Sequence, residues 1–262
     1  MSDLKFPTTK EYTKKDIKRV QKRLLEMADI VFDIFDRNNI KYMIGYGPLL
    51  GAVRHKEFIP WDDDLDLFVF DENYEKALEV LRKELPSDLI VHDRETDPIY
   101  WPYWSRIRDL NSETIAELWP NDNKYKYKGI NLDLYKLEPV KEKNAKKLIY
   151  KHNLEYQNNI RRSRLISSRK CLVNKMKIYP KYLKEVIKSK FSKKNTEGYC
   201  FVLNVPFIKK ADVFPLKKYD FEGRKLNGPK NYDRMLKLLY GEYLKIPNYN
   251  KRRAHYSKVI FK

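Results

Sequence analysis

The stretch Ile59-Pro60-Trp61-Asp62-Asp63-Asp64-Leu65-Asp66-Leu67 decides the fold prediction, because acidic residues here lead directly into an apolar segment. Residues 64–70 have the pattern of a buried strand, in which alternate side chains share a face. Asp64 and Asp66 should therefore project together, while the intervening leucines enter the core. Two adjacent carboxylates repel each other unless a cation lies between them, and Mg²⁺ prefers oxygen ligands. The pattern predicts the metal site of a phosphoryl- or nucleotidyl-transferring enzyme.

A third acid occurs in a similar setting further along the chain, in Leu132-Asp133-Leu134 of a predicted strand at 130–135. A lone acid on a strand is most often an exposed residue or a turn cap, whereas three in apolar surroundings favour one shared site. The strand at 130–135 must then lie beside the strand at 64–70. Asp64, Asp66 and Asp133 are the predicted catalytic and metal-binding residues, with one or two Mg²⁺ ions as cofactor and Mn²⁺ as a substitute.

Candidate phosphate contacts follow the turn Gly45-Tyr46-Gly47-Pro48, which precedes a predicted helix at 49–55. Glycines allow close approach of the backbone to a ligand, and a helix N-terminus offers free N–H groups to phosphate. Glycine pairs of this kind are also common in ordinary turns. Basic residues follow the turn, and two arginines share a face of the predicted strand at 105–108. The predicted phosphate or nucleotide contacts are Gly47, Arg54, His55, Lys56, Arg106 and Arg108.

Aromatic residues make up 14% of the chain and concentrate in Tyr100-Trp101-Pro102-Tyr103-Trp104, with Trp119 nearby in sequence. Rings in such numbers can enclose a quaternary ammonium group through cation–π attraction. The alternative is that they pack the edge of the sheet or stack on a base. The predicted cation-binding residues are Tyr100, Trp101, Tyr103, Trp104 and Trp119.

Positive charge is concentrated in one segment. The chain has a net charge of +19, and residues 141–194 contain 18 Lys or Arg against 3 Asp or Glu, a net of +15. Such a segment attracts a polyanion, either nucleic acid, an acidic membrane face or an anionic glycopolymer. A solvated helical face is the simpler alternative. Two cysteines, no apolar run long enough to span a membrane and no signal-like apolar stretch at Met1–Lys5 favour a cytoplasmic location.

The order of predicted elements favours an α+β fold with a small mixed sheet and packed helices. A helix should begin after a cap at Thr13 and end near residue 37, with strands at 40–44, 64–70, 89–91, 105–108 and 130–135. Long basic helical sequence follows Pro139, and strands at 200–205 and 219–222 and a helix at 231–240 complete the chain. The expected units are a catalytic core at 1–139, a basic helical segment at 140–197, and a short C-terminal α/β segment at 198–262 that completes the catalytic domain.

Residues Gly47–Asp66 resemble the signature of the LicD family, which belongs to the nucleotidyltransferase-fold superfamily and is related to fukutin and fukutin-related protein. The resemblance runs from about Thr13 to about His255, and the basic segment at 141–194 matches least. Supporting stretches lie at 106–111, 129–134, 214–216, 221–223 and 240–244. The resemblance implies a nucleotidyltransferase-like core.

The resemblance also implies an activity, with Asp64 and Asp66 as the metal-binding pair and Asp133 as the third acid. The activity is transfer of phosphocholine from CDP-choline to a sugar hydroxyl of lipopolysaccharide, teichoic acid or a lipid-linked precursor, with release of CMP. The aromatic cluster would then bind choline. Pro48 in place of Thr or Ser, and Tyr135-Lys136 in place of an aromatic residue followed by Pro, depart from the family pattern and leave the carboxylates in place.

Other functions stay open. The donor could carry ribitol, glycerol or a sugar phosphate, or the enzyme could transfer a nucleotide from a nucleoside triphosphate to a small molecule. A basic nucleic-acid-binding module fits the pI of about 9.6, but the acids at 62–66 would repel a phosphate backbone, so no nucleic-acid partner is expected. The basic segment favours an anionic glycan or lipid-linked acceptor and peripheral contact with the inner membrane face. His255, in the C-terminal segment Arg252-Arg253-Ala254-His255, could reach the site, but it is not counted among the predicted site residues.

Overall fold

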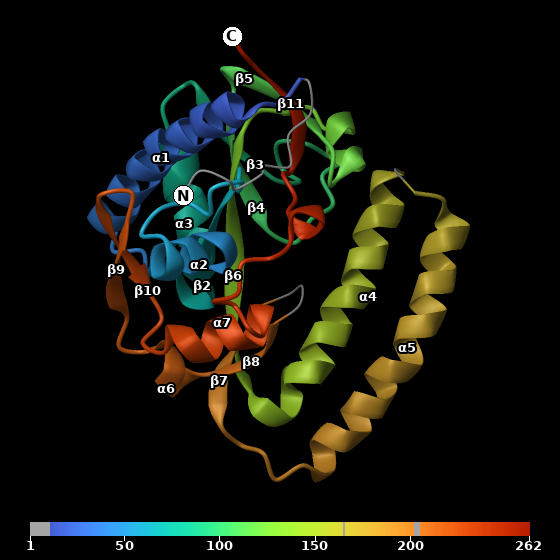
Figure 1. Cartoon of the computed structure of the whole chain (residues 1–262). Helices are drawn as coiled ribbons and strands as arrows, with labels where there is room; N and C mark the ends of the chain where they lie inside the picture. Colours follow the sequence, from blue (N-terminus) through green and yellow to red (C-terminus); the bar gives the residue numbers. More distant parts are fainter. Residues whose placement is uncertain (1–10, 165, 202–204) are drawn as a thin grey trace.

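The computed structural model describes residues 11–164, 166–201 and 205–262. The stretch Met1–Lys5 and residues 202–204 of the strand expected at 200–205 lie outside this part of the chain. Helices pack on a mixed sheet, so the α+β prediction is confirmed (Figure 1). Within the described ranges, no helix is both long enough and apolar enough to cross a bilayer.

The central sheet is built around one parallel strand pair. Its order is β1 (Tyr42–Ile44), β2 (Leu65–Phe70), β6 (Asn131–Lys141), β4 (Ser105–Asp109) and β3 (Leu89–His92). β2 and β6 are parallel, while the other neighbours are antiparallel. The expected adjacency of the two acid-bearing strands is confirmed, and Asp66 lies directly opposite Asp133.

β6 extends beyond the predicted strand because its second half has a separate set of partners. Its residues Glu138–Lys141 pair with β7 (Glu197–Phe201), and β7 in turn pairs with β8 (Val205–Lys209). The chain after the basic segment thus returns to the same sheet.

Helices cover the sheet and bury its leucines. α1 (Lys14–Arg37) begins at the predicted cap, where Thr13 and Asp16 form a reciprocal capping box. α1 and α3 (Asp71–Glu84) contact β6, and α3 also contacts β2. The leucines that alternate with the acids are fully buried, namely Leu65, Leu67, Leu132 and Leu134. Because alternate strand residues face opposite sides, the acids project away from these leucines.

A second group of elements lies around α2 (Tyr46–Arg54). It comprises α6 (Lys210–Val213), β9 (Lys217–Phe221), β10 (Arg224–Gly228) and α7 (Tyr232–Tyr240). α2 contacts β9 and α7, and β10 contacts β1. The predicted helix at 231–240 is confirmed, with Asn231 as its N-cap and Gly241 as its C-cap.

The C-terminal strand β11 (Tyr256–Phe261) pairs antiparallel with β5 (Ser112–Ala116). The sequence analysis predicted neither strand. This pairing joins segments about 140 residues apart in the chain and brings the residues just before β11 to the acidic end of β2.

The basic segment forms a helical hairpin of α4 (Ala145–Ser163) and α5 (Ser168–Phe191), preceded by a short turn at Glu142–Asn144. The hairpin stands beside the sheet, with α5 outermost (Figure 1). Ring contacts attach α4 to the body, where Tyr156 meets Trp101 at 5.0 Å and Tyr103 at 5.4 Å between ring centres.

Candidate active site

Asp66 and Asp133 face each other across the parallel pair, and each is only 5% exposed. The Oδ1 atom of Asp66 is buried without a hydrogen-bond partner. Burial, followed by the charges of Asp64 and Asp133, raises the pKa of Asp66 well above its ordinary value. A bound cation would provide this unpartnered carboxylate oxygen with a partner and would offset its repulsion from the neighbouring acids.

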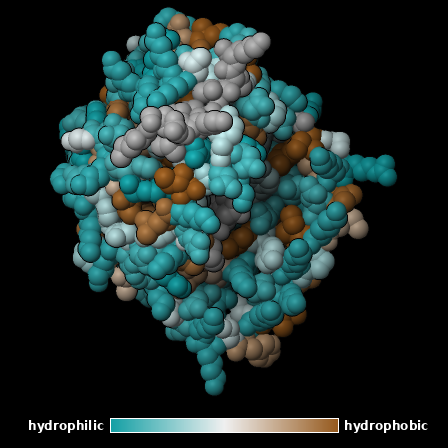
Figure 2. Space-filling view, in the orientation of Figure 1, coloured by the Kyte–Doolittle hydropathy of each residue, from teal (hydrophilic) through white to brown (hydrophobic). Residues whose placement is uncertain are grey.

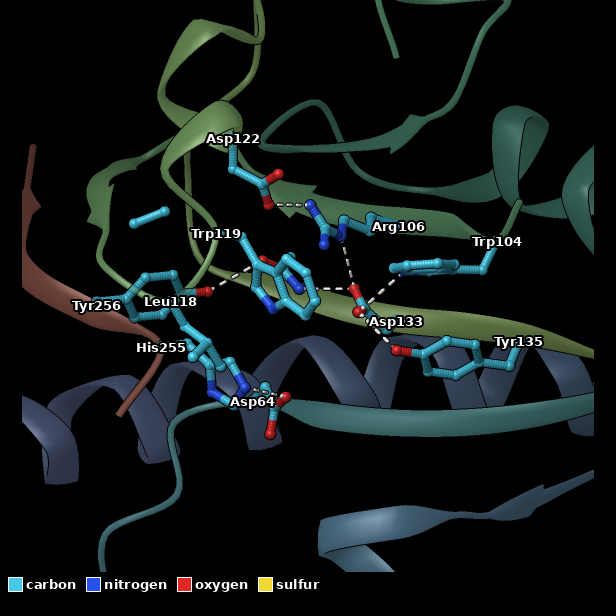
Figure 3. A pocket seen from close by; sticks show the side chains of 12 residues that line it. Asp64, Trp104, Arg106, Leu118, Trp119, Asp122, Asp133, Tyr135, His255 and Tyr256 are labelled. Atoms are coloured by element: carbon cyan, nitrogen blue, oxygen red, sulfur yellow. Dashed lines mark hydrogen bonds and ion pairs between the residues drawn. The ribbon is translucent and has the colours of Figure 1, made fainter. Parts of the chain in front are cut away.

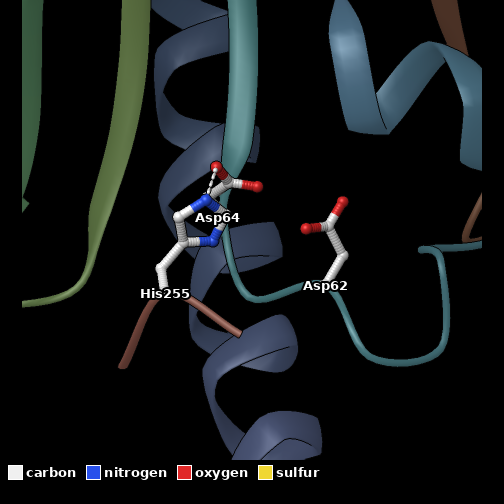
Figure 4. Close-up of side chains that lie close together, drawn as sticks. All are labelled: Asp62, Asp64 and His255. Atoms are coloured by element: carbon white, nitrogen blue, oxygen red, sulfur yellow. Dashed lines mark ion pairs between the residues drawn. The ribbon is translucent and has the colours of Figure 1, made fainter. Parts of the chain in front are cut away.

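Asp62, Asp64 and His255 point toward one another at the start of β2 (Figure 4). One ligand atom from each lies within 4.8 Å of the others. Gln21 of α1 fixes the loop before the strand, because its Nε2 donates to the carbonyl oxygens of Asp62 at 2.7 Å and Ile59 at 3.3 Å. Carboxylate oxygens are ligands that divalent cations prefer, and an imidazole nitrogen can join them once it has lost its proton.

Gly47 makes room for this group. A Cβ atom at Gly47 would lie 2.3 Å from Oδ2 of Asp62, so a side chain at that position would displace the carboxylate. Burial and then the charge of Asp64 raise the pKa of Asp62, and burial together with Asp63 and Asp133 raises the pKa of Asp64 although His255 opposes the shift. The residues present therefore fit a divalent cation that neutralises their mutual repulsion.

Asp63 bonds to His255 and ties the C-terminal segment to the site. Its carboxylate is fully buried and accepts hydrogen bonds from the Tyr12 hydroxyl, the His255 backbone N–H and Nδ1 of His255, each at 2.8 Å. Nε2 of His255 then lies 3.2 Å from Asp64. Although burial lowers the pKa of His255, the charges of Asp64 and Asp63 raise it well above its usual value overall.

The predicted site residues include neither Asp62 nor His255, although the sequence analysis named His255 as able to reach the site. Asp62 belongs to the quoted acidic run, so its proximity to Asp64 was the available signal. No local pattern places His255 in the site, because its position depends on the pairing of β11 with β5.

A cavity of about 170 Å³ opens beside the acids, between β4, β6 and the β5–β11 pair (Figure 3). Asp64 and His255 line one side, and Trp104, Trp119 and Tyr135 contribute aromatic surface. The remaining lining residues are Arg106, Ala116, Leu118, Asp122, Asn131, Asp133 and Tyr256. The cavity therefore combines acidic and aromatic walls.

Asp133 organises the wall of this cavity. Its Oδ1 accepts from Nε of Arg106 at 2.9 Å and from Nδ2 of Asn131 at 2.6 Å. Its Oδ2 accepts from Nε1 of Trp104 at 3.0 Å and from the Tyr135 hydroxyl at 3.2 Å. Both oxygens are thus engaged, and Asp133 would have to exchange one of these donors in order to bind a metal.

The two strand arginines share a face as predicted but have different surroundings. Arg106 lines the cavity and pairs with Asp133 and with Asp122, an acid that the sequence analysis did not single out. Arg108 is buried behind it, where Nη1 donates to the carbonyl oxygen of Gly129 at 2.6 Å and to Asn131 at 2.9 Å. Arg108 is not among the residues that line the cavity.

The predicted aromatic group divides between two locations. Trp104 and Trp119 line the cavity, and Trp119 is 49% exposed. Tyr100 and Trp101 instead belong to a separate buried cluster, and Tyr103 packs against His152 and Tyr156 of α4. Tyr135, which was not in the predicted group, lies 5.1 Å from Trp104 between ring centres.

Arg54 at the end of α2, and His55 and Lys56 after it, are not among the residues that line the cavity. Arg54 is half-buried, and its guanidinium donates to Nε2 of His55 at 2.8 Å and to the Tyr243 carbonyl oxygen at 3.2 Å. It also interacts electrostatically with Asp62. Burial and Arg54 lower the pKa of His55, so this imidazole is neutral at pH 7. Lys56 is exposed in a turn with a positive φ of 60°. Of the three, Arg54 is the residue with a resolved electrostatic interaction with a metal-binding candidate, Asp62.

Comparison with known proteins agrees with this geometry. Residues 39–193 match the model of the LicD/FKTN/FKRP nucleotidyltransferase domain, which covers more than half of the chain. The chain belongs to this family. Its α+β fold is accordingly nucleotidyltransferase-like, and the chain is a phosphotransferase.

Two curated relatives carry functional names. The chain is 24% identical over 259 residues to the lipopolysaccharide cholinephosphotransferase LicD of Haemophilus influenzae, with 90% of this chain and 94% of that protein covered. It is 38% identical over 100 residues to the ribitol 5-phosphate transferase FKRP of Mus musculus, a match that covers 37% of this chain and 20% of that protein.

The first prediction concerns the repulsion among the acids. In metal-free protein, Asp66→Asn should raise the melting temperature by about 2–4 °C, since relief on the order of 1 kcal/mol has that effect in a domain of this size. The raised folded-state pKa means that Asp66 stabilises the protein below its unfolded-state pKa and loses this contribution as pH rises through its folded-state pKa. The gain should therefore be larger at pH 8 than at pH 5.

Melting curves with and without Mg²⁺ check this prediction. Wild type should gain stability from Mg²⁺ and Asp66→Asn should gain much less. Asp36→Asn, on an exposed position of α1, is the matched control and should behave as wild type. A metal-free Asp66→Asn protein that is less stable than wild type would contradict the interpretation.

Proposed function

We propose that this phosphotransferase moves phosphocholine from CDP-choline to a sugar hydroxyl of an anionic cell-surface glycan, lipopolysaccharide or teichoic acid, or of its lipid-linked precursor. The observation that carries the proposal is a cavity lined both by Asp64, a member of the candidate metal-binding group, and by the aromatic rings of Trp104, Trp119 and Tyr135. Acids suit the cation that accompanies a diphosphate, and aromatic rings suit a quaternary ammonium.

We propose that Asp64 and Asp66, with Asp62 beside them, hold one or two Mg²⁺ ions, or Mn²⁺ in their place. When bound, such an ion supplies positive charge to the phosphoryl oxygens and lowers the pKa of an attacking hydroxyl. His255 fixes the orientation of Asp64 and is itself held by Asp63. Asp133 remains a proposed third acid, and its four hydrogen bonds support a role in holding Arg106, Trp104 and Tyr135 in place.

The proposed transfer joins the acceptor oxygen to the choline-bearing phosphorus and breaks the bond from that phosphorus to CMP. Arg54 and Arg106 are the proposed contacts for the phosphoryl oxygens. Arg106 is already paired with two carboxylates, so Arg54 is the better candidate for the charge that develops on the leaving CMP. Gly47 and the start of α2 would lie close to the nucleotide phosphates.

The choline head group would lie against Trp104, Trp119 and Tyr135. Asp122 lines the same cavity, but its carboxylate is paired with Arg106 and Arg108, so the aromatic rings rather than this charge support a cationic head group. We propose Tyr100, Trp101 and Tyr103 as support for this wall, since the Tyr100 hydroxyl donates to the carbonyl oxygen of Trp104 at 2.9 Å.

The basic hairpin favours an anionic acceptor, because opposite charges raise the local concentration of such a substrate. A lipid-linked acceptor would place the enzyme in the cytoplasm with peripheral contact to the inner membrane face. The match to the ribitol 5-phosphate transferase favours a second candidate, transfer of ribitol phosphate from a CDP-linked donor.

The second prediction tests the acidic group. Asp64→Asn should reduce the rate of CMP release from CDP-choline at least ~10³-fold. The substitution removes a ligand of the proposed Mg²⁺ ion, so the negative charge on the phosphoryl oxygens is no longer neutralised in the transition state. Release of CMP should be measured with Mg²⁺ and with excess chelator, and Asp36→Asn should keep the wild-type rate. A folded Asp64→Asn protein that releases CMP at nearly the wild-type rate would refute the assignment.

The third prediction tests the head-group site. Trp119→Ala should raise the Michaelis constant for CDP-choline about tenfold, since a cation–π contact contributes roughly 1–2 kcal/mol when desolvated. CDP-ribitol and CDP-glycerol assayed in parallel report on the donor class. Tyr249→Ala removes a ring that is 46% exposed and lies outside the cavity lining, and it serves as the matched control that should leave the Michaelis constant unchanged. An unchanged Michaelis constant in Trp119→Ala, or preference of the wild type for CDP-ribitol, would reject choline and leave the enzyme class intact.

A further inference from the structure

The outer face of α5 carries a continuous stripe of exposed apolar side chains. Its members follow one another at intervals of four, three, four, four and four residues, which keeps them on one side of a helix. They are between 42% and 81% exposed, and comprise Leu172, Met176, Tyr179, Leu183, Ile187 and Phe191. Exposed apolar side chains scattered singly are ordinary, but an aligned row along a whole helix marks an interaction surface.

The packing of α5 explains why this stripe stays uncovered. The opposite face of the helix packs on α4, where Asn174 bonds to Gln157 and Lys175 bonds to Asn158. In the described ranges, the main contacts of α5 are with α4 and the turn at Glu142–Asn144. The helix thus forms the edge of the molecule, and apolar side chains lie among hydrophilic ones on this side of the surface (Figures 1 and 2).

A row of lysines runs alongside the apolar stripe. Lys177, Lys181, Lys184 and Lys188 repeat at intervals of four, three and four residues, so they occupy one neighbouring strip of the same helix, and all are exposed. The surrounding segment adds further positive charge, with 18 basic against 3 acidic residues at 141–194. An apolar stripe bordered by lysines is the pattern of a helix that lies in the surface of an anionic membrane.

We propose that the outer face of α5 docks on an anionic lipid surface, with the apolar stripe at the acyl boundary and the lysine row among the head groups. Charge complementarity selects this occupant. A nucleic acid would use the lysines but leave the apolar stripe exposed to water. A second copy of the chain would cover the stripe but bring two lysine rows close together.

The attachment of α4 connects this surface to the cavity. Tyr156 and His152 of α4 hold Tyr103, the residue next to Trp104 in the cavity wall. Docking would therefore hold the cavity at a fixed position relative to the lipid surface. Docking would favour lipid-linked acceptors. That preference rests on the proposed function, whereas the docking surface itself does not.

The test is sedimentation of the full chain with vesicles of phosphatidylglycerol and phosphatidylcholine, compared with vesicles of phosphatidylcholine alone. Wild type should bind the anionic vesicles, and Leu183→Ser with Ile187→Ser should weaken binding at least tenfold. Lys177→Gln, Lys181→Gln and Lys184→Gln together should weaken it roughly 100-fold, about fivefold for each lysine near the surface. The control pair Ile115→Ser and Ile260→Ser changes residues that are 45% and 47% exposed on the β5–β11 pair and should bind as wild type.

The first outcome that would overturn the proposal is no binding of wild type to anionic vesicles. The second is loss of binding in the lysine variant while the serine variant binds as wild type, and the third is a concentration-dependent dimer that the serine substitutions abolish. The second outcome would indicate adhesion to any polyanion, which double-stranded DNA in the same assay would detect. Circular dichroism confirms that each variant is folded. Because Asp64→Asn should lose CMP release and keep vesicle binding, failure of the proposed function and failure of the docking surface are separable.

Discussion

The β2–β6 pair and the loop before β2 hold several carboxylates close together, and their electrostatic repulsion is the constraint that the rest of the site must offset. Asp64 and Asp66 lie close to Asp133, and Asp62 lies beside Asp64. Asp66 and Asp133 are buried and the other two acids are partly buried, so the arrangement is unfavourable without a compensating charge. Positive groups on the surrounding elements offset part of this repulsion. Arg106 compensates Asp133, His255 compensates Asp64, and the remaining negative charge is concentrated where a divalent cation would bind.

The local part of this arrangement was predictable from the sequence, and the part built by distant contacts was not. The alternation at Asp64 and Asp66 and the repeated setting of Asp133 are encoded within single strands, and the observed register confirms that the two strands are adjacent. The position of His255 depends instead on β11 pairing with β5, a contact between distant segments that strand periodicity does not reveal.

The aromatic cluster illustrates the same limit within five residues. The sequence indicated an accumulation of rings, but neighbours in space decide which rings face the cavity. Trp104 faces Asp133 because its indole N–H donates to that carboxylate, whereas Trp101 packs against Tyr156 of α4. The basic segment likewise revealed its charge in the sequence, while the alignment of the exposed apolar stripe on α5 required knowledge of which helix face packs on α4.

The central claim is that the acids at the start of β2 form a divalent-cation site, and electron paramagnetic resonance of Mn²⁺ tests it most directly, because free and bound ions give different signals. The account predicts one or two bound ions per wild-type chain, tighter binding when CDP-choline is present, and loss of binding in Asp64→Asn. Equal Mn²⁺ binding by wild type and a folded Asp64→Asn protein would contradict it.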